Sequence, residues 1–271
     1  CMMGMVAGAG ALLEQLFGLP ALVGNLILAA VVFLVAVTGA QGILTSFGIV
    51  VPLLVAAALV VGVLAFLFLP AEGIPNQPFS SGNPLLGNWF FSALSFISYN
   101  MMAAISILVP LSRDMEDTRT IRRGMALGAG LLTLIFVFIL LPMILYRTLV
   151  SQAELPMLAL ASRIFPALGV VYALLLLCGM FTAALSSLFG ITSRMEAKLG
   201  GRLSRRFVAL LCAAAFAGSI FGFKNVVSYI YPLCGYVGFF ALIGVALHAR
   251  ALRGSPASPP EAPQDQPSSK T

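Results

Sequence analysis

The sequence contains uncharged stretches that are too long for the core of a soluble protein. From Gln15 to Ala71 there is no Asp, Glu, Lys, Arg or His. A helix needs roughly 20 apolar residues to cross the hydrocarbon of a bilayer. The whole chain is 60% hydrophobic and 9% charged, whereas soluble domains are about 45–50% apolar and about 25% charged. We therefore predict an all-α, polytopic membrane protein, because helices satisfy their own backbone hydrogen bonds in lipid.

Proline, glycine and charged residues divide the chain into apolar runs of membrane-spanning character, which predict about eight transmembrane helices. The runs are 1–17, 20–38, 41–69, 85–111, 123–146, 167–193, 206–223 and 226–252. Residues 70–83 read as a loop, and 155–165 as a short helix at the membrane interface. We expect one transmembrane helical domain, 1–253, followed by a disordered cytoplasmic tail, 254–271, which is rich in proline.

The basic residues predict the orientation of these spans. Every second connection between the spans lies on the same side of the membrane. Twelve of the fifteen Lys and Arg residues fall in connections on one of the two sides. They are Arg113, Arg119, Arg122, Arg123, Arg194, Lys198, Arg202, Arg205, Arg206, Arg250, Arg253 and Lys270. The other side holds Arg147, Arg163 and Lys224. Positively charged loops stay in the cytoplasm, so we expect a multi-pass protein of the bacterial cell membrane with a cytoplasmic C-terminus.

Ionisable side chains are too sparse within the spans to assemble an enzyme active site. The single histidine, His248, and the four cysteines, which show no C-x-x-C spacing, indicate neither a metal site nor a disulfide framework. We expect no catalytic residue, no metal and no nucleic-acid partner. Glu14 is the one carboxylate within an apolar run, and it reads either as an interfacial acid that reaches water or as a vestibule or gate residue.

A polar triplet, Ser98, Tyr99 and Asn100, lies in the middle of the run 85–111. Serine and asparagine offer the backbone alternative hydrogen bonds, so the helix could unwind here. Broken helices are a recurrent way to hold a solute at the bilayer midplane. The triplet, with Tyr236 of the last run, is therefore a candidate substrate site. The alternative is a continuous helix in which Asn100 bonds a neighbouring helix and Tyr99 packs.

Hydroxyl side chains follow one another in the run 167–193. Thr182 and Ser186 are four residues apart and share a helix face, and Ser187 accompanies them. Such a row could contribute oxygens to a sodium site. Equally, each hydroxyl could bond the carbonyl four residues before it and do nothing else. The last run is expected to be kinked around Pro232, with Tyr229 and Tyr231 belonging either to a pathway or to an aromatic belt.

The Ser-Tyr-Asn triplet, the Ile-Leu-Val-Pro-Leu that follows it with a basic loop, and the Phe-Thr-Ala-Ala-Leu-Ser-Ser stretch resemble the YkvI family of bacterial membrane proteins. This family is related to the amino acid, polyamine and organocation transporters, which have the LeuT-type fold. The resemblance implies that the eight runs correspond to helices three to ten of a ten-helix inverted-repeat core. It also implies that this chain is truncated at its N-terminus and that the partner of the predicted break lies in a helix that is absent.

Together these features predict a secondary transporter of a small organic solute, such as an amino acid, coupled to a cation by alternating access. No cofactor is expected beyond a sodium ion or proton as the coupling ion, and the partners expected are the lipid bilayer and the solute. The alternative is a transporter-like sensor or structural subunit that moves nothing. The sequence does not indicate an oligomeric state.

Overall fold

The computed structural model describes residues 1–38, 43–70, 85–112, 117–151, 153–199 and 204–254, and this part of the chain is helical, with no strand. The elements are α1 (Met2–Phe17), α2 (Ala21–Thr38), α3 (Ile43–Phe68), α4 (Trp89–Ser112), α5 (Thr118–Leu145), α6 (Arg147–Val150), α7 (Pro156–Ile164), α8 (Pro166–Leu199), α9 (Arg205–Ser219), α10 (Phe223–Asn225), the π-helix η1 (Val226–Ile230) and α11 (Tyr231–Gly254).

Each of the eight predicted apolar runs forms a helix: α1, α2, α3, α4, α5, α8, α9 and α11 with the short elements before it. Five stretches of the described chain are long and apolar enough to cross a membrane: Ala21–Thr38, Val50–Phe68, Arg119–Leu145, Pro166–Glu196 and Phe223–Val245. Helices α1 and α9 are shorter, at 16 and 15 residues. The predicted class, an all-α polytopic membrane protein, is confirmed.

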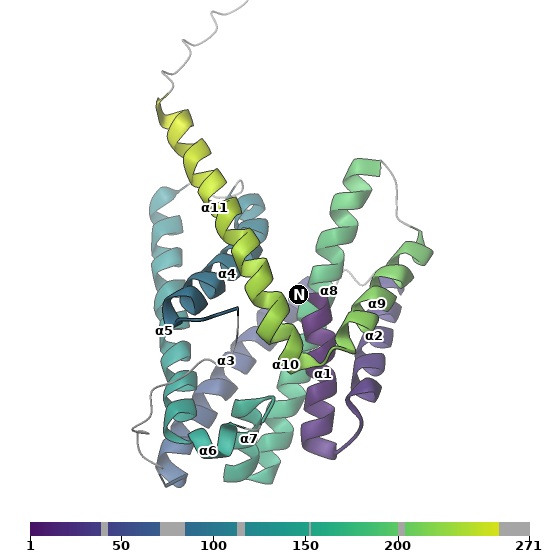
Figure 1. Ribbon diagram of the computed structural model, residues 1–271, viewed down its shortest axis with the longest axis vertical. Helices are drawn as coiled ribbons and strands as arrows, with labels where there is room; N and C mark the ends of the chain where they lie inside the picture. The colour runs from purple at the N-terminus through teal and green to yellow at the C-terminus, as the bar shows by residue number, and fades with distance from the viewer. Residues whose placement is uncertain (39–42, 71–84, 113–116, 152, 200–203, 255–271) are drawn as a thin grey trace, which may run out of the picture.

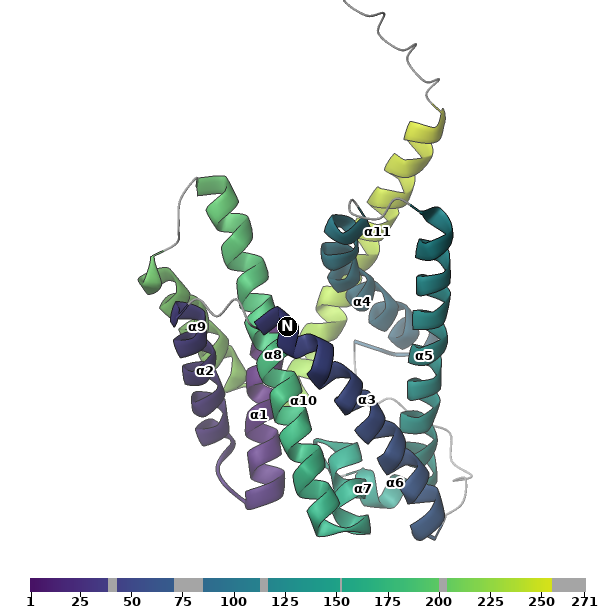
Figure 2. The same cartoon turned by 180° about the vertical axis from the view of Figure 1, so that it is seen from behind.

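The helices form two groups that are joined at one end. In Figures 1 and 2, α1, α2, α8 and α9 stand together on one side, while α3, α4, α5 and α11 occupy the other. Helix α8 packs against α1, α3 and α7, and α3 packs against α5, α7 and α8, so α3 and α7 connect the groups. Helix α4 packs chiefly against α11.

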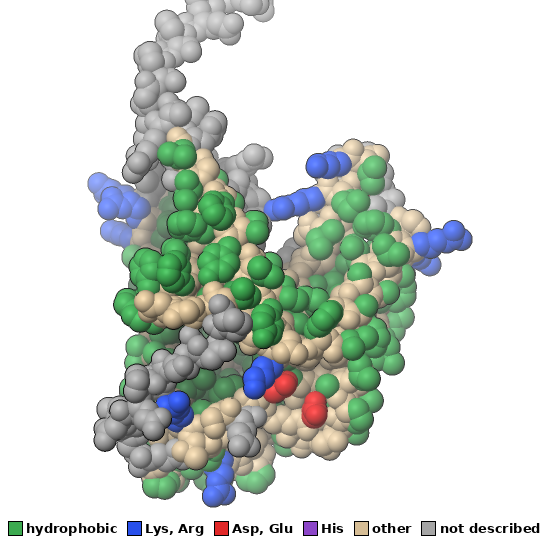
Figure 3. All heavy atoms as spheres, in the orientation of Figure 1, with side chains coloured by type: hydrophobic (Ala, Val, Ile, Leu, Met, Phe, Trp, Pro, Cys, Tyr) green, Lys and Arg blue, Asp and Glu red, His purple; other side chains and the backbone are tan. Residues whose placement is uncertain are grey.

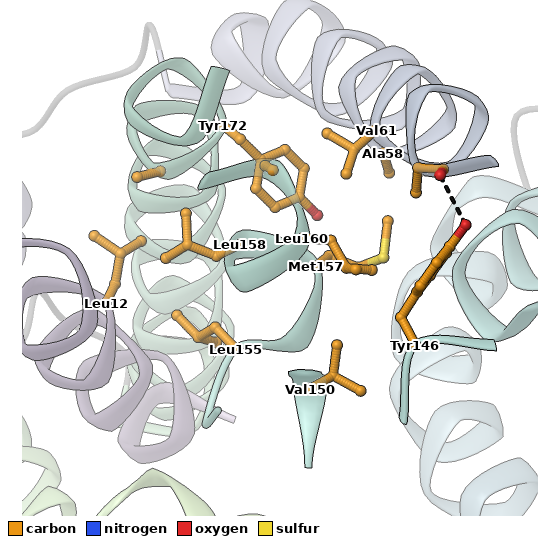
Figure 4. Packing of buried hydrophobic residues seen from close by; sticks show 13 residues of the cluster. Leu12, Ala58, Val61, Tyr146, Val150, Leu155, Met157, Leu158, Leu160 and Tyr172 are labelled. Carbon is orange, nitrogen blue, oxygen red and sulfur yellow. Dashed lines mark hydrogen bonds between the residues drawn. The ribbon is translucent and has the colours of Figure 1, made fainter. Parts of the chain in front are cut away.

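The joined end contains a hydrophobic cluster built around α7 (Figure 4). Leu158, Leu160 and Ala161 of α7 are at most 1% exposed and pack among residues of α1, α3, α5 and α8. The short helix expected at 155–165 is therefore present. Its apolar residues, however, face the protein interior, because the ends of four longer helices surround it.

A second cluster holds α1, α2, α8 and α9 together. Its buried members come from all four helices: Met2, Val6, Ala9, Leu28, Ala29, Val32, Ala184, Leu185, Leu188, Cys212 and Ala215. Many of these side chains are small, which lets apolar helices approach one another closely where lipid provides no hydrophobic driving force between them.

Charged side chains gather at the two ends of the molecule, and a hydrophobic belt separates them (Figure 3). The beginnings of α5 and α9 and the ends of α8 and α11 lie toward the same end of the molecule (Figure 1). These are the segments whose connections hold most of the basic residues. Helices α6 and α7, with Arg147 and Arg163, lie at the opposite end. The connections rich in basic residues therefore lie at the same end of the molecule, as the sequence predicts. Which end faces the cytoplasm stays a prediction. Of the predicted tail, 254–271, Gly254 is the last residue of α11, and 255–271 lie outside the described residues.

Candidate functional site

The expected break in the run 85–111 is wrong, since α4 is continuous from Trp89 to Ser112. The Ser98 hydroxyl donates to the carbonyl of Leu94 at 2.8 Å, and the Asn100 side-chain amide donates to the carbonyl of Phe96 at 2.8 Å. Both side chains thus bond the backbone four residues earlier. These carbonyls accept the additional bond within an intact turn, so the polar side chains are satisfied without unwinding.

The irregularity lies instead at the start of the last helix. Residues Val226–Ile230 form a π-helix between α10 and α11. Pro232 lies two residues after the end of η1; it has no amide to donate, and its ring crowds the carbonyl four residues earlier. A wider turn relieves that crowding, and π-turns of this kind occur frequently at functional sites. An irregularity was predicted in this run around Pro232, but its π form could not be read from the sequence.

Two tyrosines stack where α1, α4 and α11 meet. The rings of Tyr99 and Tyr231 lie with centroids 4.8 Å apart and planes 17° from parallel. The Cys1 sulfur lies 2.9 Å from the Tyr99 hydroxyl, within hydrogen-bonding distance. The Tyr231 hydroxyl sits against Gly4, where a Cβ would collide with it. We call Tyr99, Tyr231, Cys1 and Gly4 the tyrosine junction.

Helices α4 and α11 approach closely beside this junction. A Cβ at Gly235 would lie 2.5 Å from the Ser95 carbonyl oxygen, and one at Gly238 would lie 2.8 Å from that of Ser98. The Ser95 hydroxyl donates to the Pro232 carbonyl at 3.3 Å. Ser98 is only 1% exposed, so its role here is to pack between two helices.

The four predicted substrate residues do not converge on one cavity. Ser98 is buried against α11, Tyr99 belongs to the tyrosine junction, and Asn100 is exposed. The Tyr236 hydroxyl donates to the carbonyl of Leu85 at 2.6 Å, which ties α11 to the residues before α4. Of the set, Tyr99 is the residue that stacks on another aromatic ring. Its partner Tyr231 was read from the sequence only as a pathway or belt residue.

The predicted ion residues on α8 bond mainly to their own helix. Thr182, which is 4% exposed, donates to the carbonyls of Cys178 at 3.0 Å and Gly179 at 2.9 Å. Ser187 donates to the carbonyl of Ala183 at 2.8 Å, and Ser186 is exposed. Because α8 packs against α1, α3 and α7, the structure does not bring this row against the triplet of α4.

An open crevice at the joined end contains Glu14, the carboxylate singled out in the sequence. Ala11, Glu14, Gln15, Ala153 and Glu154 line a cavity of about 230 Å³. Beside it, the Gln15 amide nitrogen donates to the carbonyl of Leu155 at 3.0 Å, and the Leu155 backbone amide donates to the Gln15 amide oxygen at 3.0 Å. Glu14 therefore lies at a contact between α1 and the segment before α7, and it is exposed, so both readings of it stay predictions.

The residues that the structure describes contain no group of three or more His, Cys, Asp or Glu side chains that could hold a metal. The arrangement offers hydroxyl, amide and carboxylate groups together with a stacked aromatic pair. Such groups can bind and orient a polar solute.

The helices and their apolar surfaces define the class: a polytopic helical membrane protein. The chain is 29% identical, over 251 residues, to a Bacillus subtilis (strain 168) protein described as "Uncharacterized membrane protein YkvI". The match covers 92% of this chain and 70% of that relative. The chain is also 23% identical, over 251 residues, to "Uncharacterized protein YyaD" of the same organism, covering 90% of this chain and 70% of the relative. No family model matches the chain. No solved structure matches it either.

The predicted similarity to YkvI is therefore found over most of the chain, and it supports a location in a membrane.

Proposed function

We propose that this protein is a member of the YkvI family that acts as a secondary transporter of a small organic solute. The solute class that we propose is an amino acid or a related compound, moved by alternating access and coupled to a sodium ion or proton. The proposed fold is the LeuT type, with the eight membrane helices corresponding to its third to tenth. The proposed location is the bacterial cell membrane, with the C-terminus in the cytoplasm.

The observation that carries the proposal is the π-helix η1, which adjoins the tyrosine junction. Irregular turns in membrane helices occur frequently at functional sites, and transporters bind solutes at irregular stretches of their helices. Here Tyr231 is the first residue after the π-helix and stacks on Tyr99. A change in the π-turn would therefore move the Tyr231 ring directly.

The packing of α4 and α11 supports movement of the kind that alternating access needs. These two helices contact each other far more extensively than they contact the rest of the described chain. Helix α1 meets α10 and η1, the elements that lead into α11. The pair can thus rotate as a unit about the tyrosine junction, while α1, α2, α8 and α9 remain packed together.

The test is uptake by the whole protein reconstituted in liposomes, with radiolabelled amino acids supplied under an inward sodium or proton gradient. We expect uptake with one of the gradients, and a loss of at least tenfold in Tyr231→Ala, which removes the stacked ring. Tyr229→Ala is the matched control, because Tyr229 is exposed two residues earlier.

Absence of solute movement under either gradient would refute the transporter proposal. Binding of an amino acid without movement would instead favour the sensor alternative. Equal losses in Tyr231→Ala and Tyr229→Ala would show that the tyrosine junction has no special part in transport.

A further inference from the structure

The first half of α5 is left uncovered by the rest of the described chain. Every residue from Arg122 to Leu134 is exposed. The contact of α5 with α3 includes its second half, where a Cβ at Gly62 would lie 2.5 Å from the Phe138 carbonyl oxygen. Of the five stretches of membrane length, that of α5 has the smallest buried share, 6% against 22–33% for the others. In a bilayer, a helix face that no protein covers is in contact with lipid.

Three arginines stand on one face at the beginning of this half. Arg119, Arg122 and Arg123 are three and four residues apart, a spacing that places them side by side on a helix, and all three are exposed. Figure 3 shows basic side chains gathered at the upper left, where Figure 1 places the beginning of α5. Residues 124–145 contain no charge and span about 33 Å as a helix, close to the hydrocarbon thickness of about 30 Å. The arginines therefore lie at the depth of the lipid phosphates.

These arginines have no side-chain hydrogen bond or ion pair within the described part of the chain. The acid beside them, Asp117, caps the helix instead. Its carboxylate accepts from the backbone amides of Arg119 at 2.9 Å and Thr120 at 3.3 Å, and from the Thr120 hydroxyl at 2.7 Å. Asp114 and Glu116 precede the helix and lie outside the described residues. Guanidinium groups that are free in this way can bind phosphate oxygens through paired hydrogen bonds.

Small side chains continue the arginine face into the apolar part of α5. Ala126, Ala129, Gly130 and Thr133 recur at the same spacing, and a Cβ at Gly130 would meet no atom within 4 Å. The Thr133 hydroxyl donates to the Ala129 carbonyl at 2.9 Å, which satisfies it within the helix. At 100° per residue, larger exposed side chains flank this row on both sides: Leu127 and Leu134 on one, Met125 and Leu132 on the other. An acyl chain can thus lie close to the helix backbone directly below the arginines.

We infer that this face of α5 is a binding site for an anionic phospholipid. The three arginines hold the headgroup phosphate, and an acyl chain lies along Ala126 and Gly130. General attraction between a basic surface and anionic lipid follows the number of charges near the membrane. This site depends in addition on which helix face the charges share. It is formed by other helices than the tyrosine junction, and it does not rest on the proposed transport.

Native mass spectrometry of the whole protein in detergent tests the site, with phosphatidylglycerol or phosphatidylcholine of identical acyl chains as the added lipid. We expect phosphatidylglycerol to bind about tenfold more tightly than phosphatidylcholine, because the latter carries an ammonium group that the arginines repel. The triple variant Arg119→Gln, Arg122→Gln, Arg123→Gln should lose this preference. Since all three side chains are exposed, the variant should fold normally.

The matched control for charge is the triple variant Arg194→Gln, Arg205→Gln, Arg206→Gln. It removes the same charge from α8 and α9 toward the same end of the molecule, and it should keep the preference. Equal binding of the two lipids by the wild-type protein would overturn the proposal. So would an equal loss of preference in the two triple variants.

Two glycines test the contact with the acyl chain. Gly130→Leu places a large side chain in the row of small residues and should weaken phosphatidylglycerol binding several-fold. Gly128→Leu is the control, because Gly128 is equally open and lies on the opposite side of the helix. Equal weakening in both variants would contradict the inference. Displacement of phosphatidylglycerol by an equal concentration of soluble glycerol phosphate would also overturn it, because the site would then recognise free phosphate.

Discussion

Gly24 shows how a single residue controls the distance between α1 and α2. A Cβ at this position would lie 2.8 Å from the Ala9 carbonyl oxygen and 2.8 Å from the Gly10 Cα. Both are backbone atoms, which cannot move aside as a side chain does. The next residue, Asn25, is 2% exposed and donates to the Ser219 carbonyl of α9 at 3.4 Å. The close approach thus also places a buried amide between three helices.

We expect Gly24→Ala to destabilise the protein by about 1–3 kcal/mol, the usual cost of overpacking. Gly128→Ala is the control, because a Cβ at Gly128 meets no atom within 4 Å on the exposed surface of α5. Thermal unfolding in detergent should separate the two variants. A loss of stability that is equal in both would contradict the close-packing explanation.

The side-chain amide oxygen of Asn25 has no hydrogen-bond donor in the described part of the chain. It lies against Gly10, where a Cβ would collide with it. Contacts between a Cα–H and an oxygen are weakly favourable at helix interfaces. Gly10 therefore matters for the environment of Asn25 as well as for the helix spacing.

At the scale of elements, helix ends are fastened by side chains from elsewhere. The last turn of α3 leaves carbonyls without helical partners, as every helix end does. The Tyr146 hydroxyl, beside the end of α5, shares its proton between two carbonyls: that of Leu69 at 3.0 Å, and that of Ala65 at 2.8 Å, which also accepts from the Leu69 backbone amide at 3.0 Å. Figure 4 shows the Tyr146 side chain at the edge of the cluster, with its hydroxyl bonded to a backbone carbonyl oxygen.

Tyr146→Phe should lower the stability of the joined end by about 1 kcal/mol, since a typical net hydrogen bond contributes about that amount. The ring remains, so the hydrophobic packing is unchanged. Exchange of the amides in the last turns of α3 should rise, while exchange in α9 should not. An equal rise in both helices would indicate general loosening instead.

The π form of η1 depends on a single residue, Pro232. Pro232→Ala supplies the missing amide and removes the ring, so we expect η1 to convert to regular α-helix. Such a change alters the register of Tyr231 relative to Tyr99. We predict a loss of uptake with little loss of thermal stability. Normal uptake in Pro232→Ala would show that the π-turn is dispensable.

At the scale of the whole molecule, the distribution of charge decides orientation in the membrane. The end that holds the beginnings of α5 and α9 and the ends of α8 and α11 is the more basic, and basic loops remain in the cytoplasm. We expect a cysteine placed at Ser204 to react with impermeant thiol reagents only from the cytoplasmic side. A cysteine at Ser151 should react only from outside.

Both variants are made in a background in which Cys1, Cys178, Cys212 and Cys234 are replaced, because all four are free thiols. Labelling of the two new cysteines from the same side would mean that the helices between them do not alternate as the structure has them. Labelling in the reverse sense would invert the proposed orientation.

The sequence by itself determined the class of protein and the approximate limits of its membrane helices. Uncharged stretches of this length are unfavourable in water, and a helix is the structure that satisfies the backbone in lipid. The short helix after Leu155 was also predictable, since its apolar residues recur at helical spacing. None of these conclusions required knowledge of which helices are neighbours.

The tertiary structure decided which polar residues meet. Ser98 looked like a binding residue because it belongs to a polar triplet that could unwind the helix, and Thr182 because it belongs to a row of hydroxyls, yet local carbonyls satisfy both of them. The Tyr99–Tyr231 stack joins residues from distant parts of the chain. The contact of Gln15 with Leu155 does so too. Apolar helices of similar length can pair in many ways in lipid, and only close packing of the whole set selects one.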